Sequence, residues 1–196
     1  MYGLELLHGT YQEAVSVFLT KYGGATDDYF SEKSYARFKA GEIKTLAKRK
    51  ISRTSEGLYC HHIDEDKMIM IASPNFIRSR DIPFDYQRKD RLVYCNLIEH
   101  GILHLLIASE TYGRGSEFGC LPGVGGYVNF IRPNLIQWLI DGVEPKLSWQ
   151  KACRDAVLMN KHAARKLIKQ MDRFLFDHYP SITKKELEKG CEAFQY

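Results

Sequence analysis

The 196-residue sequence has no uninterrupted hydrophobic run of the roughly 20 residues that span a lipid bilayer. Its longest apolar stretch, Leu97–Ala108, is interrupted by Glu99, His100 and His104. The first residues, Met1–Glu13, lack the basic start and the long apolar centre of a secretion signal. We therefore expect neither a membrane partner nor secretion of the chain.

Cysteine and net charge are also sparse. Five cysteines, an odd number, occur without any CxxC spacing, which is typical of reduced thiols in a cytoplasmic protein. The chain has 28 Lys and Arg against 24 Asp and Glu, and this net charge of +4 is too small to indicate a nucleic-acid partner by itself. With 44% hydrophobic and 27% charged residues, the composition excludes a disordered chain and a fibre.

Helical patterns at both ends of the sequence flank a central part that contains strand-forming residues. We predict an α+β, mostly helical fold with a small antiparallel strand pair, Leu58–Ile63 and Arg91–Cys95, packed on a buried helix at Leu97–Ala108. The chain divides into an N-terminal helical segment (1–56), a core (57–108) and a glycine-rich loop followed by C-terminal helices (109–196), which together form one compact unit.

Other elements are expected on either side of this core. A capping box at Thr10–Glu13 opens a helix that continues to about Tyr22. Met68–Ala72 is a candidate for a further short strand. The glycine-rich loop is expected at Tyr112–Gly126. Further helices are expected at Asp27–Lys39, Gly41–Lys50, Pro133–Asp141, Ser148–Asn160, Lys161–His178 and Thr183–Phe194.

Four of the seven histidines form two pairs in the central segment, His61-His62 at the end of a strand and His100-x3-His104 on a helix. Residues four apart lie on one helical face, so the second pair can hold one metal ion. Gly101 leaves that face uncrowded. A third imidazole from the strand would complete three protein ligands and leave positions open for water and substrate, as in catalytic sites. A lone histidine would be an ordinary core residue, but two pairs favour a metal site.

These motifs resemble those of the HNH, or ββα-metal, nucleases. The matching stretches are Tyr59-Cys-His-His-Ile63, Asp90-Arg-Leu-Val-Tyr-Cys-Asn-Leu-Ile-Glu-His100 and Gly101-Ile-Leu-His104, within about a quarter of the chain. The resemblance implies that His61, His100 and His104 hold one divalent ion (zinc, manganese, nickel or magnesium). It also implies that His62 is the general base that activates water.

The activity implied by the resemblance is that of a metal-dependent endonuclease, which hydrolyses phosphodiester bonds of nucleic acid, DNA more than RNA. In the family an Asn, about nine residues before the first helix histidine, braces the loop and helps to orient the base. Arg91 stands at that position, preceded by Asp90. Asp90 is a candidate for the bracing role, and Arg91 is a candidate for a catalytic contact with the phosphate.

Several basic residues could contact nucleic acid. Four lie between the two strand candidates, and solvated surface charge is the alternative interpretation: Arg78, Arg80, Arg88 and Lys89. A second basic cluster lies earlier in the sequence, on the predicted helix 41–50: Lys44, Lys48, Arg49 and Lys50. For this cluster we favour a solvated helix face over a phosphate contact. Cys60 and Cys95 are expected to be buried thiols on paired strands rather than zinc ligands.

Two other functions are compatible with the same motifs. The chain could be a non-cleaving nucleic-acid-binding or inhibitor protein on an HNH-like scaffold. It could also be a structural metal-binding module whose C-terminal helices bind a protein partner. The sequence indicates no oligomeric state.

Overall fold

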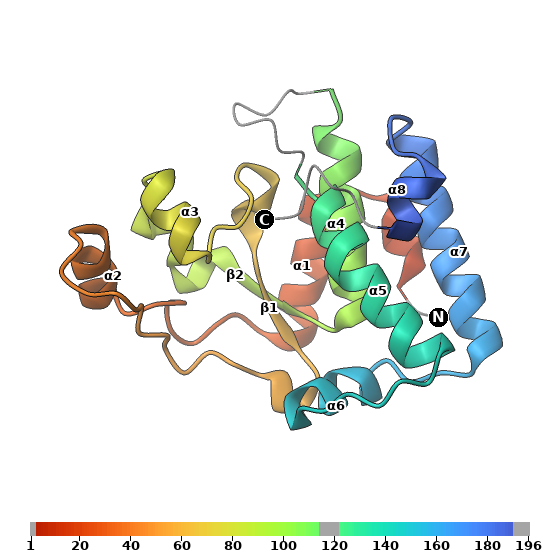
Figure 1. The fold of residues 1–196 in the computed structure, drawn as a ribbon, viewed down its shortest axis with the longest axis horizontal. Coiled ribbons are helices and arrows are strands. Elements are labelled where there is room, and N and C mark those ends of the chain that lie inside the picture. Colours follow the sequence, from red (N-terminus) through yellow and green to blue (C-terminus); the bar gives the residue numbers. More distant parts are fainter. Residues whose placement is uncertain (1–2, 114–121, 190–196) are drawn as a thin grey trace.

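The computed structural model describes residues 3–113 and 122–189. The fold is mostly helical and contains a two-stranded antiparallel sheet, which confirms the α+β class (Figure 1). The strands are β1 (Tyr59–His62) and β2 (Leu92–Cys95). The helices are α1 (Tyr11–Tyr22), α2 (Glu32–Lys39), α3 (Pro74–Ser79), α4 (Leu97–Thr111), α5 (Arg132–Leu135), α6 (Ser148–Asp155), α7 (Lys161–His178) and α8 (Lys184–Lys189). Among the described residues, no helix is both long enough and apolar enough to traverse a bilayer.

Strand β1 pairs with β2, and α4 follows β2 after a single residue. The register places Tyr59 opposite Cys95 and His62 opposite Leu92. Asn96 caps α4, because its side chain accepts a hydrogen bond from the Glu99 amide (3.0 Å) while the Glu99 carboxylate accepts one from the Asn96 amide (2.8 Å). This capping box fixes the start of the helix just before His100 and thereby the face on which the two helix histidines lie.

Helix α4 is the centre of the larger hydrophobic core and packs against α1, α7 and the π-helical turn Gly126–Ile131 that precedes α5. The prediction that Gly101 leaves the metal-binding face of this helix uncrowded is wrong. A Cβ at this position would lie 2.5 Å from Met171 Cε on α7 and 3.3 Å from Ile131 Cγ2. Gly101 therefore allows close helix packing and does not open the face of α4 toward a metal.

A smaller core lies on the other side of the sheet. It is formed by side chains from α2 and the residues just before it, from α3 and from the loop between the strands: Phe30, Tyr35, Phe38, Ile71, Ile77 and Ile82. Figure 1 shows α2 and α3 on one side of β1 and β2, with α1, α4 and α7 on the other. The end of β1, which carries His61 and His62, consequently lies between the two cores.

Two predicted elements are wrong. Residues 41–50 do not form a helix. The Arg49 amide donates to the Tyr29 carbonyl (3.1 Å) and the Ser31 amide donates to the Ala47 carbonyl (2.9 Å), so the end of this run pairs with the residues before α2. Backbone pairing with residues 29–31, rather than the helical pattern of the sequence, decides the conformation of this segment. The run Met68–Ala72 is a turn rather than a strand, because Met70 adopts a left-handed conformation with φ of 58°.

The C-terminal predictions agree in part with the structure. The helix expected from Pro133 already begins at Val124 and contains the π-helical turn Gly126–Ile131, and α6 ends at Asp155. The rest of the glycine-rich loop, 114–121, lies outside the described residues, as does the end of the helix predicted to reach Phe194.

Candidate metal centre

Three imidazoles converge between β1 and α4. One ligand nitrogen from each of His61, His100 and His104 lies within 4.8 Å of the other two. The Nε2 atoms of His100 and His104 are 3.2 Å apart, close to the separation of about 3.3 Å between ligands of a tetrahedral zinc with bonds of about 2.0–2.1 Å. This group could therefore hold a metal ion. Cys60 and Cys95 are free thiols on the paired strands and do not belong to the group; Cys95 is buried, as expected, whereas Cys60 is only partly buried.

The tautomer of His61 follows from its contact with Tyr11 on α1. The Tyr11 hydroxyl donates to the Ile63 carbonyl (2.9 Å), so it accepts a hydrogen bond from His61 Nε2 (2.9 Å). His61 Nδ1 is then the nitrogen with the free lone pair. It is buried and has no hydrogen-bond partner among the described residues. A hydrogen bond from the distal nitrogen is the usual way in which proteins orient a histidine ligand.

Glu65 lies beside this group of three histidines and was not indicated by the sequence. It lies on the short 3-10 turn Ile63–Asp66 after β1. Its Oε2 atom is 3.8 Å from His61 Nδ1 and 3.6 Å from His104 Nε2. Burial raises the pKa of this carboxyl to about 7. A carboxylate oxygen here could complete a four-coordinate site. The acidic run Asp64-Glu-Asp66 is visible in the sequence, but only the conformation of the turn decides which of its carboxylates points toward the histidines.

The three imidazoles are in the neutral form that binds metals. Burial, together with the neighbouring imidazoles, lowers the pKa of His61 and of His100 well below the usual value. Burial lowers the pKa of His104 to about 4. At neutral pH, a metal ion would therefore not have to displace protons from these ligands.

Gly126 lets the π-helical turn approach the ring of His104. A Cβ at this position would lie 2.2 Å from His104 Cε1 and 2.3 Å from His104 Nδ1. Any side chain at residue 126 would consequently displace the imidazole. The glycine-rich run Gly123-Val-Gly-Gly126 is visible in the sequence, but the sequence does not show which glycine faces the ring.

His62 leaves β1 on the face opposite His61, because successive strand residues alternate. Its Nε2 is 3.1 Å from Gln87 Oε1, and Gln87 Nε2 donates to the Ile71 carbonyl at 3.0 Å. Since the Gln87 oxygen accepts, His62 Nε2 carries the proton and Nδ1 keeps its lone pair. The ring of Tyr29 packs on that of His62, with centroids 4.5 Å apart. Burial lowers the pKa of His62 to about 4.

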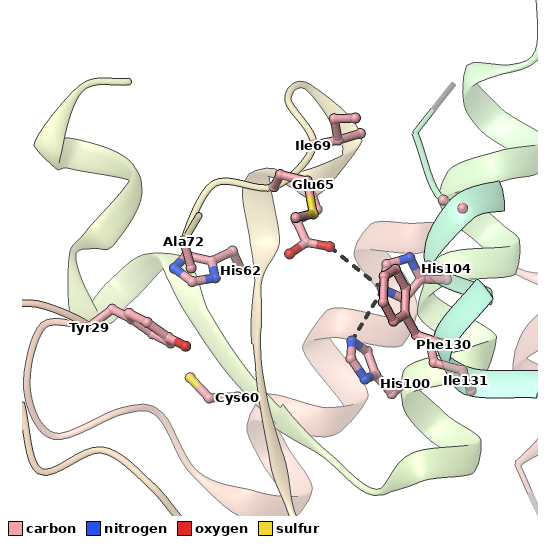
Figure 2. A pocket seen from close by; sticks show the side chains of 14 residues that line it. Tyr29, Cys60, His62, Glu65, Ile69, Ala72, His100, His104, Phe130 and Ile131 are labelled. Carbon is pink, nitrogen blue, oxygen red and sulfur yellow. Dashed lines mark hydrogen bonds and ion pairs between the residues drawn. The ribbon is translucent and has the colours of Figure 1, made fainter. Parts of the chain in front are cut away.

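A cavity of about 250 Å³ joins His62 to the metal centre. Figure 2 shows His62 on one side of this cavity, His100 and His104 on the other, and Glu65 between them. The strand alternation that separates His61 from His62 therefore does not isolate His62 from the metal centre. A water molecule in the cavity could be contacted by His62 on one side and by a metal ion at His100 and His104 on the other.

Gln87, which is fully buried, ties His62 to the loop at Ile71, and the bracing role of Asp90 stays a prediction. Arg91 Nη1 lies 3.4 Å from Asp64 Oδ1, and Arg91 is not among the residues that line the cavity. The structure thus places His62 in the same cavity as His100 and His104 and leaves the Arg91 side chain outside it.

The four loop cations also lie outside the cavity lining. Arg78 donates to two backbone carbonyls, those of Phe38 (3.2 Å) and Ile43 (2.8 Å). The Arg80 guanidinium lies 5.5 Å from the centre of the Phe76 ring. Arg88 is surrounded by the carboxylates of Asp28, Glu32 and Asp85. The Lys89 amide donates to Asp28 Oδ1 (2.9 Å). For Arg78 and Arg88, these contacts support a role in holding the loop.

No family model matches the chain, and neither a curated protein nor a solved structure matches it.

Proposed function

We propose that this protein is a metal-dependent endonuclease that hydrolyses phosphodiester bonds. His61, His100 and His104 would hold one divalent ion, with Glu65 as a fourth ligand, and His62 would be the general base. The observation that carries the proposal is the cavity that His62 shares with His100 and His104. The chain order of strand, loop, strand and helix is also the order that the resemblance to HNH nucleases implies.

The ligand set supports some metals more than others. Three imidazoles with one carboxylate suit zinc, nickel or manganese better than magnesium. A divalent ion at this centre would bind the scissile phosphate and stabilise the charge on the leaving oxygen.

His62 has the orientation that a general base needs. Gln87 holds its Nε2, so Nδ1 has the lone pair that can accept a proton from water. The low pKa of the buried ring would make it a weak base in the empty cavity. A phosphate that enters the cavity brings negative charge, and this charge would raise the pKa of His62 toward neutrality.

The test is a cleavage assay on plasmid DNA and on single-stranded RNA, with manganese, nickel, zinc or magnesium and with a chelator control. We expect metal-dependent cleavage. His62→Ala should lower the rate on the order of 10²–10⁴-fold, because a positioned base contributes this much, and should leave metal binding intact. His162→Ala is the matched control, since His162 is exposed on the first turn of α7.

Three outcomes separate the proposal from the alternatives. A His62→Ala variant that cleaves as fast as the parent would exclude His62 as the base. A parent that binds metal and nucleic acid but never cleaves would be a non-cleaving binding protein. A parent that binds metal but no nucleic acid would be a structural metal module.

A further inference from the structure

Lys48 contacts Tyr29, one of the residues that line the cavity. It belongs to the extended segment after α2, where its backbone bridges to Phe30. Its Nζ atom donates to the Tyr29 hydroxyl (3.1 Å) and lies 4.9 Å from the centre of the Tyr29 ring. Figure 2 shows the hydroxyl end of Tyr29 directed toward the cavity. The Lys48 ammonium therefore lies beside the cavity.

Two other cations near the site, Arg49 and Arg91, are paired with carboxylates. Arg49 lies 3.8 Å from Asp27, and Arg91 lies 3.4 Å from Asp64. The partner of Lys48 is instead a neutral phenol, and among the described residues no carboxylate forms an ion pair with it. An incoming phosphate would have to compete with a carboxylate at the paired cations, whereas at Lys48 it would meet an uncompensated charge.

We propose that Lys48, positioned by Tyr29, binds a backbone phosphate of the nucleic acid at the edge of the cavity. This inference rests on the proposed function and adds a residue that selects a phosphate-bearing chain. A lysine ammonium is a compact point charge that is well suited to phosphate. Lys48 is then a phosphate contact beside the candidate metal centre, at a position where its charge has no carboxylate partner among the described residues.

The test measures binding of a short, labelled single-stranded oligonucleotide at several salt concentrations, by fluorescence anisotropy. A chelator is present, so that neither cleavage nor a metal–phosphate bond contributes. We expect Lys48→Met to weaken binding and to reduce the slope of log affinity against log salt by about 0.7, the value for one phosphate contact with a single strand. Methionine keeps the apolar stem that packs on Tyr29.

Two further variants serve as controls. Lys50→Met removes an exposed charge two residues along the same segment and should leave the slope nearly unchanged. Lys48→Arg should restore the slope, because it restores the charge. An equal loss of slope in the two methionine variants would show that only the general surface charge matters and would overturn the inference.

The outcomes distinguish this inference from the proposed function. If the parent cleaves but Lys48→Met keeps the parental slope, the assignment of Lys48 is wrong and the nuclease proposal stands. If Lys48→Met lowers the slope but the parent never cleaves with any metal, the phosphate contact stands and the nuclease proposal is wrong. A parent that binds no oligonucleotide in the chelator overturns the assignment of Lys48, and a parent that also never cleaves with any metal overturns both.

Discussion

His61 and His62 are adjacent in the sequence, and both are buried, but the structure surrounds them differently. His61 contacts Tyr11 on α1, and its Nδ1 faces Glu65 near the histidines of α4. His62 contacts Gln87 from the loop between the strands and borders the cavity. Each ring therefore has Nε2 held by a neutral partner and Nδ1 free, but the two free nitrogens have different surroundings. The packing on each face of β1, rather than the histidine pair itself, separates a candidate ligand from a candidate base.

The comparison also shows why both histidines can serve one centre. A regular strand would direct them to opposite sides. Here β1 ends at His62, and the turn Ile63–Asp66 carries Glu65 back toward His61 and His104. The end of the strand is thus the place where a metal centre and a base can meet.

Removal of a helix histidine should have the largest effect. His100→Ala should lose metal binding and cleavage together, because only two of the three imidazoles remain to hold the ion. Metal should raise the melting temperature of the parent but not that of His100→Ala, because a ligand stabilises only the state that binds it. Metal titration and thermal melts check this, with His62→Ala as the matched control. Undiminished metal binding by His100→Ala would place the centre elsewhere.

Acid should strongly destabilise the metal-free protein. His62 and His104, each with a pKa near 4 in the folded state, remain neutral when folded and gain protons on unfolding. Their contribution is fully present above the unfolded pKa of about 6.5 and is lost as the pH falls toward 4, by roughly 3 kcal/mol each.

The contribution of Glu65 to the stability of the metal-free protein changes with pH in the opposite direction. Its raised pKa of about 7 favours the folded state at low pH, and this contribution is lost as the pH rises from about 4.5 through 7. Urea unfolding in a chelator, from about pH 4 to about pH 8, should therefore show a maximum of stability near pH 6.5. A flat profile between pH 4 and about 6.5 would mean that His62 and His104 are accessible to protons in the folded state.

Loss of the Tyr11 hydroxyl should weaken the metal centre and spare the base. Tyr11→Phe removes the hydrogen bond that orients His61 and should lower metal affinity about 10–100-fold, as is usual for partners of metal ligands. Competition with a chromophoric chelator measures this. Once metal is saturating, kcat should be close to that of the parent, and a large fall in kcat at saturation would contradict the separation of the two histidines.

Loss of the Gln87 amide should have the smallest effect of these changes. It should affect His62 rather than His61. Gln87→Met keeps the length of the side chain but removes the contacts with His62 and Ile71, so kcat should fall about tenfold, the value of one hydrogen bond. Metal affinity should not change. If Gln87→Met and Tyr11→Phe produced the same pattern of metal affinity and kcat, the two faces of β1 would not act independently.

Local rules predicted most of the elements that surround the site. The capping box at Thr10 begins α1, and the strands and α4 occur within a few residues of their predicted positions. These signals act over a few neighbouring residues, so they can be read without the fold. The segment 41–50 shows the limit of such rules, because its backbone pairs with residues 29–31 and this pairing decides its conformation.

The sequence by itself determined that His100 and His104 share a helix face, because their spacing matches one helical turn, and it indicated His61 as their partner. Only the tertiary structure decided which other groups reach the centre. Tyr11 is 50 residues from His61, and Gln87 is 25 residues from His62. Glu65 and Gly126 likewise depend on the direction of a turn and on the approach of a distant helix. Spacing along a chain sets which side chains share a helix face, but packing between the two hydrophobic cores sets which side chains meet across the sheet.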